Sequence, residues 1–373
     1  MKKLLCILIL PLIFFLVSCG GGGSDDLQPI EPPIDTLNIN DPTDSLHTWI
    51  PDDNFEQQLI NHGYDDYKDN QVLTSNILSV TTIDLRDIIQ MGIPEVKDLT
   101  GIEDFISLES LYTTGNPIEK IDLSSNTELE VLIMGYCYQD TLDLSSNTKL
   151  KHLYAKIHLG FINYAKLPIS IENLTFYNYK FDRSISEFTN LRDIQLYNCD
   201  FDFIIKDLQY LKTLDITFND ITIVDEIIIK NLPDLEYIYL GSVEINEFPP
   251  QDFKNLPSLE SLILYNTDLN IFSSIEEFPS LENISLVGGA EPGNISNIDL
   301  SSATNIQSVG IIGFDSLNNL SLKNGNNSII SSIRTEYNPN LYCISVDDTA
   351  HFYSLNSNQL ILDPQQYFKI NCP

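Results

Sequence analysis

Apolar side chains in this chain recur at fixed offsets within a repeating unit. Residues 108–128 and 129–149 are two copies in direct succession, LESLYTTGNPIEKIDLSSNTE and LEVLIMGYCYQDTLDLSSNTK, each 21 residues long. Positions at offsets 3 and 5 from the first leucine share one face of an extended strand, because side chains alternate along it. Each unit therefore predicts one short strand that turns an apolar face to a core. One unit cannot bury that face alone, so the pattern predicts a stack of coils.

The same pattern runs through most of the chain. The units begin at Val80, Leu108, Leu129, Leu150, Ile171, Leu191, Leu211, Leu235, Leu259, Leu281, Ile306 and Ile330, with spacings of 20 to 28 residues. Offset 3 is apolar in all of them. Strands are expected near residues 109–114, 130–135, 192–197, 236–241 and 260–265. Short units leave little room for long helices, so the opposite side of each coil is expected to be extended or 3₁₀.

The ninth position of the two copies is polar or small, Asn116 in the first and Cys137 in the second. A buried asparagine at this point satisfies backbone groups that have lost their ladder partners as the chain turns away from the strand. Cysteine is a small and easily buried substitute. Cys199 also falls at a ninth position, so Cys137 and Cys199 are interpreted as separate buried thiols.

The unit resembles the leucine-rich repeat, Leu-x-x-Leu-x-Leu-x-x-Asn/Cys-x-Leu. The whole chain is similar to leucine-rich-repeat surface lipoproteins of Gram-negative bacteria, with a distant likeness to internalins. The resemblance implies a β-rich α/β solenoid, right-handed, with short repeats of about 20–25 residues and about a dozen coils. It implies a parallel concave sheet and a mostly non-helical convex side.

Residues 1–18 have the features of a lipoprotein signal peptide. Lys2 and Lys3 form a positive start, and Leu4–Val17 is an apolar run. The run ends in Leu-Val-Ser followed by Cys19, which resembles a lipobox and implies lipidation of Cys19. The alternative is an ordinary signal peptide with an accidental cysteine. Residues 19–48 are expected to be the lipidated cysteine and a flexible linker, which begins with a run of glycines.

The remaining chain divides into an N-terminal cap at 49–79, leucine-rich repeats at 80–337 and a C-terminal cap at 338–373. The first cap is expected to hold a short helix, on which Phe55, Leu59 and Ile60 lie on one face and can close the open end of the stack. Its acidic stretch around residues 65–69 lacks the ligand and glycine positions of a calcium loop, so no metal is expected.

Cys343 and Cys372 lie together in the C-terminal cap. An exported protein can keep a disulfide there, so this pair is predicted to be bridged.

The formal net charge is −33. A field of that sign repels nucleic acid and anionic membrane surfaces, so no nucleic acid partner is expected, and the membrane is met only through the lipid anchor at Cys19. The charge favours cationic partners, although ordinary extracellular acidity also accounts for it.

The sequence carries no Gly-x-Ser-x-Gly, His-Glu-x-x-His, phosphate-loop or Cys-x-x-Cys motif. No enzyme activity and no cofactor are expected. The interpretation is an outer-membrane lipoprotein, facing the extracellular side, that binds a protein partner for adhesion or as an interaction scaffold. The alternatives are a glycan-binding lipoprotein of a nutrient uptake system and a structural envelope protein.

Side chains at offsets 4 and 6 of each unit are expected to point out of the concave sheet, with offset 2 on the same side. Many of them are tyrosines, which give a large contact area and a polar tip at modest entropic cost. The candidate ligand-binding residues are Tyr112, Tyr154, Lys156, Tyr177, Tyr197, Tyr237, Tyr239 and Tyr265. Tyr154, Tyr177 and Tyr197 are the expected centre, and Lys156 is placed to orient a carboxylate. The alternative is that tyrosine merely suits strands.

Overall fold

The computed structural model describes residues 46–86, 95–137, 141–157, 163–224, 227–245, 252–266, 278–288 and 295–373. The predicted signal peptide, Cys19 and nearly all of the linker lie outside these residues, as does the side chain of Cys137. Residues 42–373 form one compact unit.

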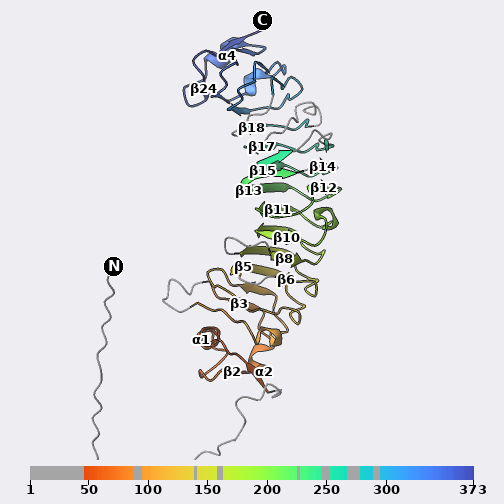
Figure 1. Cartoon of the computed structure of the whole chain (residues 1–373), viewed down its shortest axis with the longest axis vertical. Helices are drawn as coiled ribbons and strands as arrows, with labels where there is room; N and C mark the ends of the chain where they lie inside the picture. Colours follow the sequence, from red (N-terminus) through yellow and green to blue (C-terminus); the bar gives the residue numbers. More distant parts are fainter. Residues whose placement is uncertain are drawn as a thin grey trace, which may run out of the picture. The chain divides into compact units, whose positions relative to one another are not determined.

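The fold is built on a parallel sheet of thirteen strands that pair in sequence order (Figure 1). The strands are β3 (Thr82–Asp84), β4 (Ser110–Tyr112), β5 (Val131–Cys137), β7 (His152–Ile157), β9 (Asn173–Tyr177), β11 (Asp193–Tyr197), β13 (Thr213–Val224), β15 (Tyr237–Ile245), β17 (Ser261–Tyr265), β18 (Asn283–Val287), β20 (Ser308–Ile312), β22 (Ser332–Thr335) and β24 (Leu360–Leu362). Each of the first twelve begins two residues after a predicted unit start. The predicted parallel-sheet solenoid is confirmed.

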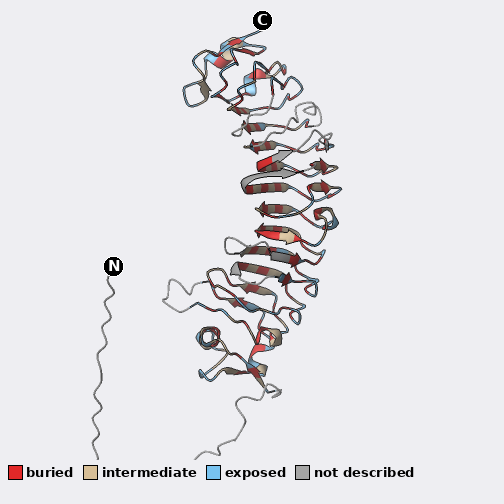
Figure 2. Ribbon diagram, in the orientation of Figure 1, coloured by how far each residue is buried: buried red, intermediate tan, exposed pale blue. Residues whose placement is uncertain are grey.

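Inward-facing side chains at offsets 0, 3 and 5 form one continuous core along the stack. Ile238 and Leu262 pair directly across β15 and β17, and neither side chain is exposed. Figure 2 shows the resulting alternation of buried and partly exposed bands along the strands. Burying one such side chain contributes roughly 1.5–3 kcal/mol, much of which offsets the entropy lost when the coil is ordered. The core therefore depends on neighbouring coils covering each other.

The opposite side of the coils carries three short parallel sheets (Figure 1). They consist of β6 (Thr141–Asp143), β8 (Asn163–Lys166) and β10 (Tyr179–Phe181); β12 (Ile204–Lys206), β14 (Ile228–Lys230) and β16 (Asp252–Lys254); and β19 (Asn297–Asp299), β21 (Asn319–Ser321), β23 (Cys343–Ser345) and β25 (Tyr367–Lys369). Short 3₁₀ helices complete the turns at η1 (Ile102–Asp104), η2 (Ile185–Glu187) and η4 (Asn327–Ile329). The predicted lack of long helices on this side is confirmed in the described repeats.

The ninth positions tie neighbouring coils together through buried side chains. Asn116 Nδ2 donates to the Leu85 carbonyl at 2.9 Å, and Asn338 Nδ2 donates to the Ile311 carbonyl at 2.8 Å. The Cys199 thiol lies 3.6 Å from the Phe176 carbonyl. Each of these carbonyls belongs to offset 5 of the preceding coil. Cysteine thus takes the asparagine's place and keeps its acceptor, and burial raises the pKa of the Cys199 thiol to about 12.

The N-terminal cap contains α1 (Asp53–Asn61), α2 (Thr74–Ile77) and an antiparallel pair, β1 (His47–Trp49) and β2 (Gln71–Leu73). Phe55 and Leu59 are buried as predicted, but Ile60 is only half-buried and Glu56 is buried in full. Glu56 is buried because its Oε1 accepts backbone N–H groups from residues 69–71, and these hydrogen bonds hold the following loop against the helix.

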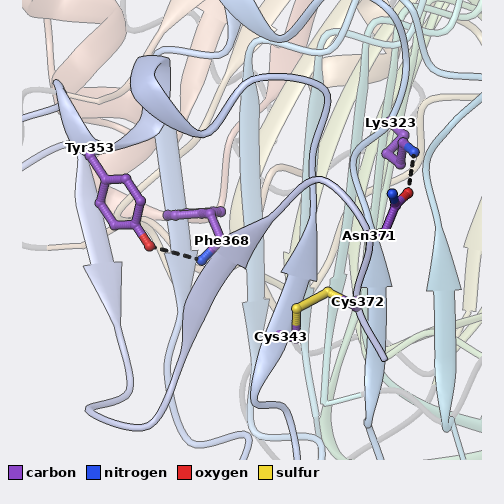
Figure 3. Close-up of a disulfide and its surroundings, with 6 residues drawn as sticks. All are labelled: Lys323, Cys343, Tyr353, Phe368, Asn371 and Cys372. Carbon is purple, nitrogen blue, oxygen red and sulfur yellow. Dashed lines mark hydrogen bonds between the residues drawn. A yellow bond between two sulfur atoms is a disulfide. The ribbon is translucent and has the colours of Figure 1, made fainter.

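The C-terminal segment continues both layers of the stack and adds α4 (Thr349–Tyr353). β24 pairs with β22 in the long sheet, and β25 pairs with β23 in the short one. A disulfide joins Cys343 on β23 to Cys372 just beyond β25, with 5.7 Å between the Cα atoms (Figure 3). Nearby, the Tyr353 hydroxyl accepts the Phe368 N–H at 3.2 Å. The last coil is thus closed by a covalent bond and by tertiary hydrogen bonds.

Candidate ligand-binding face

The outward surface of the thirteen-stranded sheet, formed by offsets 2, 4 and 6 and called here the sheet face, carries all eight candidate residues. The seven tyrosines and Lys156 are half-buried or exposed, and Tyr265 is the most open at 50% exposed. Strand alternation explains this, because each of them stands next to a buried residue at offset 3 or 5 of its unit. Partial exposure of large rings is the surface property that an interface requires.

Three of the tyrosines form a continuous ring contact. Tyr177 on β9 lies directly opposite Tyr197 on β11, and their rings stack with centroids 4.4 Å apart and an interplanar angle of 11°. Tyr154 on β7 meets Tyr177 in a tilted contact at 5.9 Å. Burial, followed by the neighbouring Tyr154, raises the pKa of Tyr177. The residues expected at the centre of the face are therefore in contact across three coils.

Lys156 stands at one end of this stack. It pairs with Tyr177 in the β7–β9 register, and its Nζ lies 5.0 Å from the centroid of the Tyr177 ring. This is within the range of a cation–π contact. This contact thus holds the Lys156 ammonium group over the Tyr177 ring, at the edge of the aromatic surface.

Asp215 stands at the other end of the stack and was not among the residues predicted from the sequence. Asp215 lies on β13, at offset 4 of the unit that begins at Leu211, and pairs with Tyr239 on β15. Its Oδ2 accepts the Tyr197 hydroxyl at 3.1 Å, and its Oδ1 accepts the Thr217 hydroxyl at 3.3 Å. Burial raises the pKa of this carboxyl, while the two hydrogen bonds act in the opposite direction. The sequence signal that was available is its position beside the tyrosines of both flanking units.

Tyr237, Tyr239 and Tyr265 extend the aromatic surface beyond Asp215. Burial first, and then the charge of Asp215, raises the pKa of Tyr237 and Tyr239. A Cβ placed on Gly241 would lie 2.9 Å from the Tyr239 ring, so that ring leans along its own strand over the glycine. Tyr265, on β17, lies opposite Gly241 on β15. These rings flank Asp215 on the side away from Tyr197.

Tyr112 does not join this cluster. Its ring lies under the Arg86 guanidinium at 4.2 Å, and Ile133 separates it from Tyr154 along the same row. We call the connected set the tyrosine strip. It comprises Tyr154, Lys156, Tyr177, Tyr197, Asp215, Tyr237, Tyr239 and Tyr265.

Within the described ranges, no group of three or more His, Cys, Asp or Glu side chains is arranged to hold a metal ion. The helices in the same ranges are all too short or too polar to cross a membrane. The chemistry offered by the strip is aromatic contact, hydrogen bonding through hydroxyl groups, and one charge of each sign.

Comparison with known proteins identifies the repeat. Residues 209–269 match the family model described as leucine rich repeat. Internalin J of Listeria monocytogenes is 28% identical over 102 residues, which is 27% of this chain and 10% of that protein. The present chain thus matches about a tenth of the length of that curated relative.

The solved functional domain of internalin J, which includes a cysteine ladder, has a TM-score of 0.55 at 18% identity and covers 86% of this chain and 69% of that one. An internalin F structure from the same species has a TM-score of 0.49 at 17% identity and covers 84% of this chain and 95% of that one. The first of these likenesses shows that the fold is that of a leucine-rich-repeat solenoid.

Proposed function

We propose that this leucine-rich-repeat solenoid is a non-catalytic, surface-displayed lipoprotein that binds a protein partner through the tyrosine strip. The observation that carries the proposal is the Tyr154–Tyr177–Tyr197 ring contact, which is aligned across neighbouring coils and faces outward. Solenoids bind through such extended surfaces. A fold by itself does not fix a function, so the physical support for binding comes from the strip.

The strip is already ordered before any partner arrives. Tyr177 is held between Tyr154 and Tyr197, and the Tyr197 hydroxyl is fixed on Asp215. Side chains that do not have to be immobilised upon binding lose less entropy, so more of the contact energy appears as affinity. The strip runs from β7 to β17, five strand spacings or roughly 24 Å. That breadth suits a protein surface better than a single sugar.

Glycan binding is a second candidate, since a carboxylate beside aromatic rings also recognises sugars. Asp215 lies among Tyr197, Tyr237 and Tyr239, which is such a combination. Probing the mature protein against protein and glycan arrays separates the two candidates. Binding to proteins alone supports the proposal, whereas binding to glycans alone replaces it.

Tyr177→Ala and Tyr197→Ala are each expected to weaken binding of the identified partner by at least about 1 kcal/mol, because truncation removes a buried anchor of the interface. Affinity is measured by calorimetry, and the fold is checked by circular dichroism. Tyr342→Ala is the matched control, since Tyr342 is 55% exposed but lies in the C-terminal cap. Unchanged affinity in the double variant would place the binding site elsewhere.

The anchor belongs to the same proposal. Cys19→Ala is expected to abolish lipidation, so that the protein leaves the membrane fraction and appears in the soluble one. Fractionation followed by immunoblotting measures this, and protease treatment of intact cells reports whether the wild-type protein faces outward. Cys6→Ala is the control, because Cys6 lies inside the predicted signal peptide. A Cys19→Ala variant that stays with membranes would refute the lipobox interpretation.

A further inference from the structure

We infer that the tyrosine strip is polarised and that Asp215 receives a cationic side chain of the partner, a guanidinium or ammonium group, while Lys156 faces an acidic one. The inference rests on the proposed function and specifies the chemistry of the partner. It follows from how the two charges are placed and from which groups surround them.

Asp215 is a half-buried carboxylate whose hydrogen-bond donors are both neutral. Its partners are the hydroxyls of Tyr197 and Thr217, and it makes no ion pair among the described residues. Asp84 occupies the same offset on β3 and provides a contrast, because the Arg86 guanidinium binds it at 2.6 Å. Most of the ion-paired carboxylates in the described ranges meet a lysine or arginine of a neighbouring coil. Asp215 instead has no cationic partner among the described residues.

The surroundings of Asp215 favour a cation. A carboxylate offers about four lone-pair directions, of which two are used here, so acceptor capacity remains for a donating group. Aromatic rings from both flanking strands lie beside it, and ring faces attract guanidinium and ammonium groups. An arriving cation would also compensate a charge that burial has made less favourable, as the raised pKa of Asp215 shows. The net charge of −33 adds attraction at longer range.

Lys156 has the complementary property at the other end of the Tyr154–Tyr177–Tyr197 stack. Its Nζ is held over the Tyr177 ring, and it forms no ion pair within the part of the chain that the structure describes. Lys151, on the same coil, is paired with Glu130 at 2.9 Å. Lys156 and Asp215 stand on strands three steps apart in the sheet, a separation of roughly 14 Å.

Two uncompensated charges of opposite sign thus bracket a stack of rings. A partner segment that carries a basic group and an acidic group at matching separation can lie along the strip in one direction only. The reversed direction would bring like charges together, which is a strong source of specificity.

The experiment uses a peptide library displayed on phage and selected on the mature full-length protein. Selected peptides are expected to contain arginine or lysine together with an acidic residue. Replacing that arginine by citrulline, its neutral isostere, should weaken binding to the wild-type protein about tenfold, the effect of losing one charged contact. Because this change is made in the peptide, the test does not depend on a protein variant folding.

The coupling to Asp215 is measured with Asp215→Asn, which retains an acceptor for the Tyr197 hydroxyl. Arginine and citrulline peptides should bind this variant almost equally, while Asp84→Asn, the matched control, should behave as wild type. Equal binding of both peptides to the wild-type protein, or a library without any peptide that depends on Asp215, would overturn the inference.

The two proposals can fail separately. Peptides that are lost in the Tyr177→Ala/Tyr197→Ala double variant but ignore Asp215 would leave the proposed function standing and remove the charge inference. Peptides that bind the double variant unchanged would remove both.

Discussion

Ile238→Asp is expected to unfold the coils around β15. Ile238 is fully buried between Leu214 and Leu262 in the long sheet. The substitution removes an apolar contact and places a carboxylate where no donor is available. Burial of an unpaired charge is among the few single changes that destabilise by about 4 kcal/mol or more. Urea denaturation followed by circular dichroism measures the loss in the free energy of unfolding.

Ile263→Asp is the matched control, because it makes the same substitution on the next strand at a position that faces outward. Ile263 pairs with Tyr239 and is half-buried on the sheet face. It should lose far less, on the order of 0.5 kcal/mol, which is the usual range for surface changes. Similar losses for the two variants would contradict the assignment of inner and outer faces.

Removing the disulfide with Cys343→Ala/Cys372→Ala is expected to lower the stability of the C-terminal coils by about 3–4 kcal/mol, because the bridge closes a loop of about 30 residues in the unfolded chain. Differential scanning calorimetry should show this part of the transition at a lower temperature.

Reductant provides the internal control for this prediction. It should destabilise the wild-type protein by a similar amount and leave the double variant unchanged, since Cys199 is a buried free thiol. A wild-type transition that does not respond to reductant would mean that the bridge adds nothing to stability.

The strand positions could be predicted because they depend on local alternation. Because the residue at offset 3 must point into the core, the residues on either side of it point outward. β11 and β17 accordingly lie at Asp193–Tyr197 and Ser261–Tyr265, within the ranges expected from the sequence. The far ends of strands were less predictable. β13 runs on to Val224 through an irregularity after Thr217, where pairing with β15 continues in a shifted register. The repeat pattern does not predict strand in that part of the unit.

The composition of the site was harder to predict, since it depends on contacts between coils. With 53 acidic residues in the chain, one more aspartate carries no signal by itself. Asp215 becomes distinctive only when the Tyr197 hydroxyl reaches it from the preceding strand. Tyr112 is the converse case, a residue whose offset suggested a contact that the structure does not show. It shares its offset with Tyr154, but the intervening Ile133 and the nearby Arg86 separate it from the other tyrosines.

The coil-by-coil pairing of the long sheet has a mechanical consequence. The hydrogen bonds between strands lie along the direction in which the coils are stacked. Tension applied between the two ends would therefore load one row of bonds at a time, and the coils would peel off singly. A released coil of 21 residues would lengthen the chain by up to about 70 Å. Residues between Cys343 and Cys372 would stay closed under the same load, because their loop is covalently locked. A solenoid built in this way yields gradually under pull and dissipates work over a long extension.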